Sequence, residues 1–199
     1  MGLVIFAALG LYLLISIIVV IVSARIAKKK DRNPWAWGFG AAFIMYNLVF
    51  WDWIPTVVAH KYYCSTEAGF WVYKTVDQWK AENPGVAKEL ISPVVSPSTH
   101  TDKELDHITI YSLNKRFNWV VKKTGPLPIN RWRWEQVVED SKTHQVLARY
   151  VDFSTGNGDI GGELELRFWR HADHCGGGAM NGGKLSTIME DVYNLGLRE

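Results

Sequence analysis

The stretch LVIFAALGLYLLISIIVVIV, residues 3–22, decides how this chain is placed. Its 20 positions carry no charge and a single serine. As a helix it would be about 30 Å long, which is the thickness of the hydrocarbon core of a bilayer. It has neither the basic start nor the cleavage pattern of a signal peptide, and helices in soluble cores seldom stay apolar on every face for this length. The stretch therefore predicts a transmembrane helix over residues 3–23.

A second apolar segment, WAWGFGAAFIMYNLVFWDW over residues 35–53, predicts another transmembrane helix over residues 35–55. Tryptophans stand at both ends, about 27 Å apart along a helix, which matches the two aromatic belts of a bilayer. Asp52 would then be hydrated at headgroup depth. The alternative is a helix that continues to Ala59 and holds Asp52 inside the membrane, where it would mark a functional site. The residues assigned to the membrane interface are Trp35, Trp37, Trp51, Asp52 and Trp53.

The connection between the two predicted helices, residues 24–34, carries the topology signal. Its basic side chains outnumber its single acid and are Arg25, Lys28, Lys29, Lys30 and Arg32. Short loops rich in Lys and Arg stay in the cytoplasm. We therefore expect a transmembrane hairpin over residues 1–58 in a bacterial inner membrane. Both termini, and a domain over residues 59–199, should be periplasmic.

The charge balance fits a membrane protein better than a nucleic-acid-binding protein. The whole chain has a formal net charge of +2, but residues 1–60 alone have five basic and two acidic side chains. The remaining residues are therefore slightly acidic, and nucleic-acid binding needs a basic face on the domain itself. The expected partners are the lipid bilayer and a membrane or periplasmic protein, with no nucleic acid.

The part after residue 64 predicts an α+β domain. Residues 65–100 read as mainly helical or irregular, with a capped helix over 76–82 and a loop at 92–99. Beyond them the apolar pattern alternates with period two, which predicts strands and a mostly antiparallel sheet. The strands are expected at residues 107–113, 131–140, 144–154 and 163–169. A helix over 185–195 should cover the sheet. Trp132 and Trp134 would lie in the core or on a binding face.

The two cysteines, Cys64 and Cys175, would both face an oxidising compartment, where two cysteines usually pair. Such a bridge closes a long loop and would stabilise the fold by about 4–5 kcal/mol in the chain-entropy model. One alternative is free thiols with solvated surface histidines. The other is a metal site, since imidazole and thiolate are zinc ligands. Its candidate ligands are His60, Cys64, His171, His174 and Cys175.

No pattern in the sequence predicts catalysis. The glycine-rich segments 155–162 and 175–183 lack the residues of a phosphate-binding loop and read as flexible loops. The acidic cluster of Asp102, Glu104 and Asp106 reads as a solvated surface. We find no nucleophile with a distinguishable base. No cofactor is expected, with zinc as the alternative.

The strings HKYYC…GFWVYKT, within residues 60–75, and VLARYVDF, residues 146–153, resemble those of a group of uncharacterised small bacterial inner-membrane proteins. The resemblance implies an apolar N-terminus followed by an aromatic-rich domain that ends near a Cys-Gly stretch. It brings no activity and no site residues.

The sequence therefore predicts a membrane-anchored α+β protein with two N-terminal transmembrane helices and a sheet covered by helices. The expected function is that of a non-enzymatic, membrane-tethered periplasmic interaction or assembly subunit of the bacterial envelope. The alternative is a periplasmic metal-binding or thiol-redox accessory protein.

Overall fold

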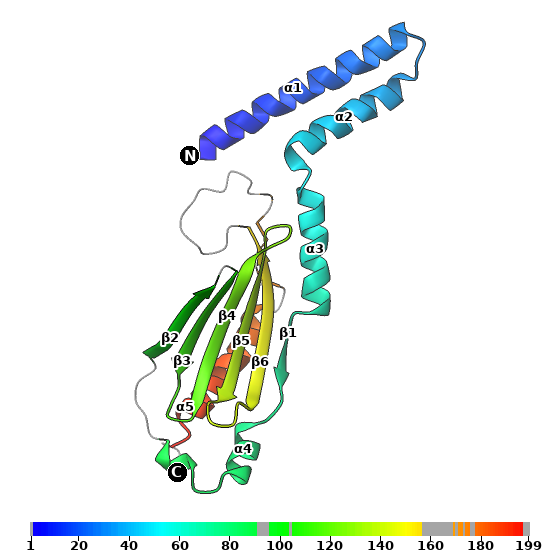
Figure 1. Cartoon of the computed structure of the whole chain (residues 1–199). Helices are drawn as coiled ribbons and strands as arrows, with labels where there is room; N and C mark the ends of the chain where they lie inside the picture. Colours follow the sequence, from blue (N-terminus) through cyan, green and yellow to red (C-terminus); the bar gives the residue numbers. More distant parts are fainter. Residues whose placement is uncertain are drawn as a thin grey trace. The chain divides into compact units, whose positions relative to one another are not determined.

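Figure 1 shows the computed structural model of the chain. It describes residues 2–90, 96–103, 105–156, 169, 171, 172, 174, 175 and 178–196. The chain divides into two compact units. The first contains residues 1–55 and 164–169, and the second contains residues 56–163 and 170–199.

The first unit contains two helices that pack against each other, α1 (Gly2–Lys29) and α2 (Pro34–Phe50). Asn33 caps α2 by accepting hydrogen bonds from the backbone N–H groups of Trp35 and Ala36, and Pro34 takes the first helical position, where its missing N–H costs nothing. Gly38 is buried on the face of α2 that meets α1. The Tyr12 hydroxyl of α1 donates to the carbonyl of Met45.

The predicted single helix over residues 35–55 is wrong. α2 ends at Phe50, and a new helix, α3 (Trp53–Thr66), begins after a break of two residues. Pro55 gives the physical reason: a proline ring clashes with the carbonyl four residues earlier, here that of Trp51, and proline has no N–H to donate. Proline is tolerated in the first turn of α3, so the chain starts a fresh helix there.

Among the described residues, α1 is the one helix that is long and apolar enough to cross a membrane by itself. None of its apolar window is buried inside the protein. α2 and α3 meet the same criterion only when they are counted together as one broken span. A signal sequence near an N-terminus would satisfy the criterion as well as a permanent anchor does.

The second unit is built on a six-stranded antiparallel sheet with the strand order β1-β6-β5-β4-β3-β2. Strands β2 to β6 follow one another as neighbours, and β1 pairs with β6 to complete the sheet (Figure 1). The strands are β1 (Gly69–Val72), β2 (Ser96–Lys103), β3 (Asp106–Ser112), β4 (Phe117–Leu127), β5 (Arg131–Asp140) and β6 (Val146–Thr155). The helical elements are α4 (Val76–Glu82), the 3-10 turn η1 (Ala87–Glu89) and α5 (Gly178–Tyr193).

The core lies between one face of this sheet and the helices α4 and α5. α5 packs on β6, β1 and α4 and supplies Leu185 and Val192. From the sheet come residues such as Phe117 and Val138, and from α4 comes Trp79. At the register shift between β5 and β6, Leu147 and the next residue, Ala148, are both fully buried in this core.

The structure confirms several predicted elements. The helix over 76–82 and the strand over 131–140 match exactly, and the hairpin of β5 and β6 is present. The expected loop at 92–99 is wrong at its end, because β2 begins at Ser96. The last helix begins at Gly178, within the second glycine-rich segment. The predicted strand over 163–169 lies outside the described residues, except for Trp169 at its end.

Candidate functional site

A cluster of two cysteines and a histidine joins α3 to the segment before α5. Cys64 and Cys175 form a disulfide between positions 111 apart in the sequence, as predicted. His60 stands one helical turn before Cys64, so its ring lies on the same side of α3. Its Nε2 atom is 3.5 Å from Cys64 Sγ. Among the described residues, His60, Cys64 and Cys175 are the one set of His, Cys, Asp or Glu side chains placed closely enough to share a metal ion.

Aromatic packing holds this part of α3 against the sheet. The Tyr63 ring lies 5.5 Å from the ring of Phe153 on β6, measured between centroids. The guanidinium of Arg131 lies 3.4 Å from the Tyr63 ring centroid, a cation–π contact. Tyr63, Cys64 and Ala68 pack on the buried cluster of Val151, Phe153 and Cys175. The position of Cys64 therefore depends on this packing as well as on the disulfide.

Asp152 fixes the other side of the cluster. Its carboxylate is 2% exposed and accepts hydrogen bonds from the backbone N–H groups of Phe153 and Cys175 and from the Tyr150 hydroxyl. Burial, and then the hydrogen bond to Asp152, raise the pKa of Tyr150. The Nδ1 atom of His174 lies 2.9 Å from the same carboxylate, and the His174 and Trp134 rings make a T-shaped contact with their centroids 5.8 Å apart.

The five predicted metal ligands are thus only partly brought together. His60, Cys64 and Cys175 form one cluster, whereas Nδ1 of His174 is directed at Asp152. His171 is exposed and is not a member of that cluster. In the predicted acidic surface, Asp102 is exposed and lies between His100 and His107, Asp106 pairs with Lys122, and Glu104 lies outside the described residues. The hydrogen bond from His107 lowers the pKa of Asp102.

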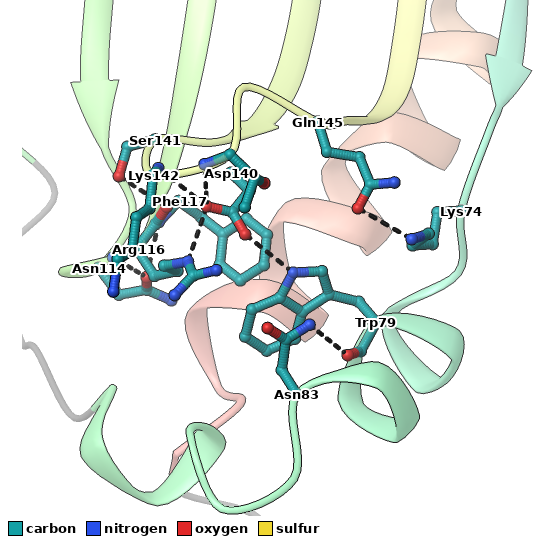
Figure 2. Close-up of polar contacts among 11 residues, drawn as sticks. Lys74, Trp79, Asn83, Asn114, Arg116, Phe117, Asp140, Ser141, Lys142 and Gln145 are labelled. Atoms are coloured by element: carbon teal, nitrogen blue, oxygen red, sulfur yellow. Dashed lines mark hydrogen bonds and ion pairs between the residues drawn. The ribbon is translucent and has the colours of Figure 1, made fainter.

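Figure 2 shows a second buried polar cluster, centred on Asp140 where β5 meets its turn. The Asp140 side chain is fully buried and accepts hydrogen bonds from Arg116 Nε at 2.7 Å and Trp79 Nε1 at 3.0 Å. The backbone N–H groups of Lys142 and Thr143 complete the set. Burial alone would raise the pKa of Asp140, but these donors outweigh it and lower the pKa to about 2. Every contact is internal, so the cluster joins α4 to two turns of the sheet.

Strand β1 forms one end of the sheet and carries exposed apolar side chains. Trp71, Val72 and the following Tyr73 are 40%, 46% and 58% exposed. Val72 also lines a groove of about 420 Å³ between α4 and α5. The groove is lined by Val72, Thr75, Val76, Asp77, Lys80, Ile188, Asp191 and Leu195. Sequence reasoning missed this strand, although the run of aromatic and β-branched residues at 70–73 is a strand signal.

The predicted interface residues divide by exposure. Trp35, Trp37, Trp51 and Trp53 are exposed, as residues that meet lipid would be. Asp52 is only 6% exposed, so the expected hydrated carboxylate is not what the structure shows. Its Oδ1 atom accepts a hydrogen bond from Trp169 Nε1 at 3.1 Å, and the Trp169 ring packs on Phe50. This contact joins positions 117 apart in the sequence, which no local pattern could have indicated.

No protein family model, curated protein or solved structure matches this chain. The resemblance of its aromatic-Cys strings to bacterial inner-membrane proteins therefore stays an expectation. The function must be argued from the chain's own residues.

Proposed function

We propose that this chain is a non-enzymatic, membrane-tethered subunit of the bacterial envelope. Its periplasmic domain would bind an extended segment of another envelope protein along β1. The observation that carries the proposal is the exposed run of Trp71, Val72 and Tyr73 at the end of the sheet. Isolated exposed apolar residues are common on protein surfaces, but a run of them on an edge strand is a hazard that proteins usually blunt with charge or proline.

Two features support a membrane anchor and a periplasmic location of the second unit. The apolar helix α1 supports a membrane anchor, and the basic residues at its end and just beyond it support a cytoplasmic connection. The Cys64–Cys175 disulfide supports an oxidising compartment for the second unit, because such bridges are rare in the cytosol. Both features agree with a domain exported across an inner membrane.

The chemistry of β1 favours an extended peptide as the partner. The N–H of Tyr73 donates to Leu147 on β6, so in an antiparallel pair the N–H of Val72 points away from the sheet. An added strand would use such outward groups, and its side chains would alternate between Trp71 and Tyr73 on one side and the groove beside Val72 on the other. Asp77, exposed at the groove, favours a basic residue in the partner.

The test is site-specific photocrosslinking in intact membranes with a photoreactive residue at Tyr73 of the full chain. We expect one adduct of defined mass, which is absent when the photoreactive residue replaces exposed Lys184 on α5. Val72→Pro should abolish the adduct because it removes the outward N–H, whereas Val72→Thr should retain it. Proline at an outward-facing edge position is compatible with folding, which the melting temperature of the variant would check.

Three results would reject this role. The first is an adduct that survives Val72→Pro, since main-chain pairing would then not be involved. The second is the absence of any Tyr73 adduct from a well-expressed, folded protein. The third is an adduct with the mass of two copies of this chain. It would mean that β1 pairs with a second copy rather than with another envelope protein.

A second candidate function is a metal-binding or thiol-redox accessory protein. It is favoured by one observation, the position of His60 Nε2 at 3.5 Å from Cys64 Sγ. An adjacent imidazole stabilises a thiolate and lowers the pKa of a cysteine once a disulfide is opened. Alkylation of the reduced protein measures this directly: the Cys64 thiol should titrate at lower pH than in His60→Ala, and equal titration would reject the role.

A further inference from the structure

The sequence presents the disulfide and the metal site as alternatives, but the structure assigns both to the same side chains. The ligand atoms of His60, Cys64 and Cys175 all lie within 4.8 Å of one another. In a tetrahedral zinc site, with Zn–N of about 2.0 Å and Zn–S of about 2.3 Å, an imidazole nitrogen and a thiolate sulfur are about 3.5 Å apart. His60 Nε2 and Cys64 Sγ already have this separation.

Both segments that carry the sulfurs are held by contacts other than the disulfide. Cys175 is 7% exposed, and its backbone N–H donates to Asp152 at 2.9 Å. α3 is held by Tyr63, which packs against Phe153 and Arg131. Opening the disulfide would therefore leave the two sulfurs near each other and near His60. Two thiolates and one imidazole would supply three ligands and leave a fourth position for water.

We propose that this cluster is a redox-gated site for a zinc-type divalent metal ion. A dithiol reductant breaks the Sγ–Sγ bond, giving two electrons and two protons to the cysteines while it is itself oxidised to a disulfide. The metal ion then displaces the two thiol protons and is held by both thiolates and a neutral ring nitrogen of His60. The oxidised protein cannot bind the ion, because the disulfide sulfurs are no longer thiolates.

This inference does not rest on the binding role of β1. It deepens the second candidate function by naming its ligand and its gate. It also selects three of the five predicted ligands, because Nδ1 of His174 lies against Asp152 and His171 is outside the cluster.

The test uses Co²⁺ as the probe on the full chain in detergent micelles, reduced with a phosphine and then freed of reductant. We expect one equivalent of Co²⁺ to bind, with the visible bands of tetrahedral cobalt and the charge-transfer band of a cobalt–thiolate bond. Zn²⁺ should displace it, and the oxidised protein should show neither band. Removing a residue that hydrogen-bonds to a metal ligand lowers metal affinity about 10- to 100-fold. His60→Ala removes a ligand itself, so it should lower the affinity at least as much.

His171→Ala, at an exposed predicted ligand that lies outside the cluster, is the matched control and should leave the bands and the affinity unchanged. Reduction could loosen the fold, so the melting temperature of the reduced protein is also measured with and without Zn²⁺. Zn²⁺ should raise this melting temperature in the natural protein and not in His60→Ala. The proposal is overturned if the reduced protein binds no Co²⁺. It is also overturned if His60→Ala binds as tightly, or if Zn²⁺ fails to stabilise a loosened reduced protein. None of these results bears on crosslinking at Tyr73, so the two roles fail separately.

Discussion

At the scale of single residues, Asp140 is a buried charge that the fold can accommodate only with all of its donors in place. Breaking a buried ion pair by removing one partner typically costs about 3–5 kcal/mol, because the other charge stays buried and uncompensated. Arg116, which lies over the ring of Trp79, would be that uncompensated charge. The cluster therefore matters for stability more than its position in the surface turns suggests.

We expect Asp140→Asn to lower the free energy of unfolding by about 3–5 kcal/mol at neutral pH, measured by urea denaturation. Glu67→Gln, which removes an exposed carboxylate just beyond the end of α3, is the control and should change it by less than about 0.5 kcal/mol. A small effect at Asp140 would mean that Arg116 remains solvated without its partner.

The same carboxylate predicts a pH dependence. Its pKa is about 2 in the folded protein and near 3.8 in the unfolded chain, so the folded state favours the ionised form. The resulting stability is fully present above pH 4 and is lost as the pH falls toward 2, by about 2 kcal/mol. The difference between the natural protein and Asp140→Asn should shrink over this window. A constant difference from pH 5 to pH 2 would contradict the assignment.

Gly125 on β4 is a position that no other residue fits. Its φ of +154° is one that L side chains rarely adopt, and an added Cβ would lie 2.6 Å from the Trp132 ring. That ring is fixed by its own hydrogen bond to the carbonyl of Gly156. Gly125→Ala should therefore destabilise the fold by about 2–4 kcal/mol. Gly183→Ala, in an open position on α5, should be neutral or slightly stabilising in the same thermal melts.

At the scale of elements, a helix or strand could be predicted only where the residues that determine it are close together in the sequence. The helix over 76–82 was predictable because its capping box is contained in the four residues 75–78. The strand over 131–140 was predictable because Arg and Trp alternate over residues 131–134 and the β-branched Val137 and Val138 follow. β2 was not, since its sequence SPSTHTDK is that of a loop and only pairing with β3 makes it a strand.

The break between α2 and α3 was open to prediction from the sequence. Pro55 falls at the end of the predicted helix, and a proline within an otherwise helical pattern is a known signal for a broken or kinked helix. The long apolar run before it favours one continuous helix and conceals this signal. The burial of Asp52 was not open to prediction, because its partner Trp169 comes from a distant segment.

The cap of α4 gives a prediction at this scale. The Thr75 hydroxyl accepts from the N–H of Gln78, and the Gln78 side chain accepts from the N–H of Thr75. Thr75→Ala removes the hydrogen bond that the hydroxyl accepts and should lower the free energy of unfolding by about 1 kcal/mol. Amide hydrogen exchange should show faster opening of α4 while the β5–β6 hairpin is unchanged. Equal protection of α4 in both proteins would show that packing of Trp79 alone holds the helix.

At the scale of the whole molecule, the candidate site lies where elements far apart in sequence meet. The sequence supplied the two cysteines and the histidine one turn before the first, but not the roles of Asp152 and Tyr63, which hold them in place. Those roles arise from the pairing of β6 with its neighbours and the packing of α3 on it. Local patterns can therefore nominate ligands but cannot show which of them meet.

The membrane topology is the remaining prediction, and it depends on the five basic residues between positions 25 and 32. Three of them lie near the end of α1 and two follow it, and together they should keep this segment in the cytoplasm and the C-terminus in the periplasm. A phosphatase that is active only in the periplasm should work when fused to the C-terminus, and a fluorescent protein that matures only in the cytosol should stay dark there.

Reversing three of these charges should weaken the preference for this orientation, because the positive charges that hold the segment in the cytoplasm are removed. The variant combines Lys28→Glu, Lys29→Glu and Lys30→Glu. The same change at Lys88 and Lys184, two exposed positions of the second unit, should leave this preference intact. If the C-terminal fluorescent fusion is bright and the phosphatase fusion is inactive, the C-terminus lies in the cytosol. The disulfide would then be in a reducing compartment, and the proposed envelope role would be rejected.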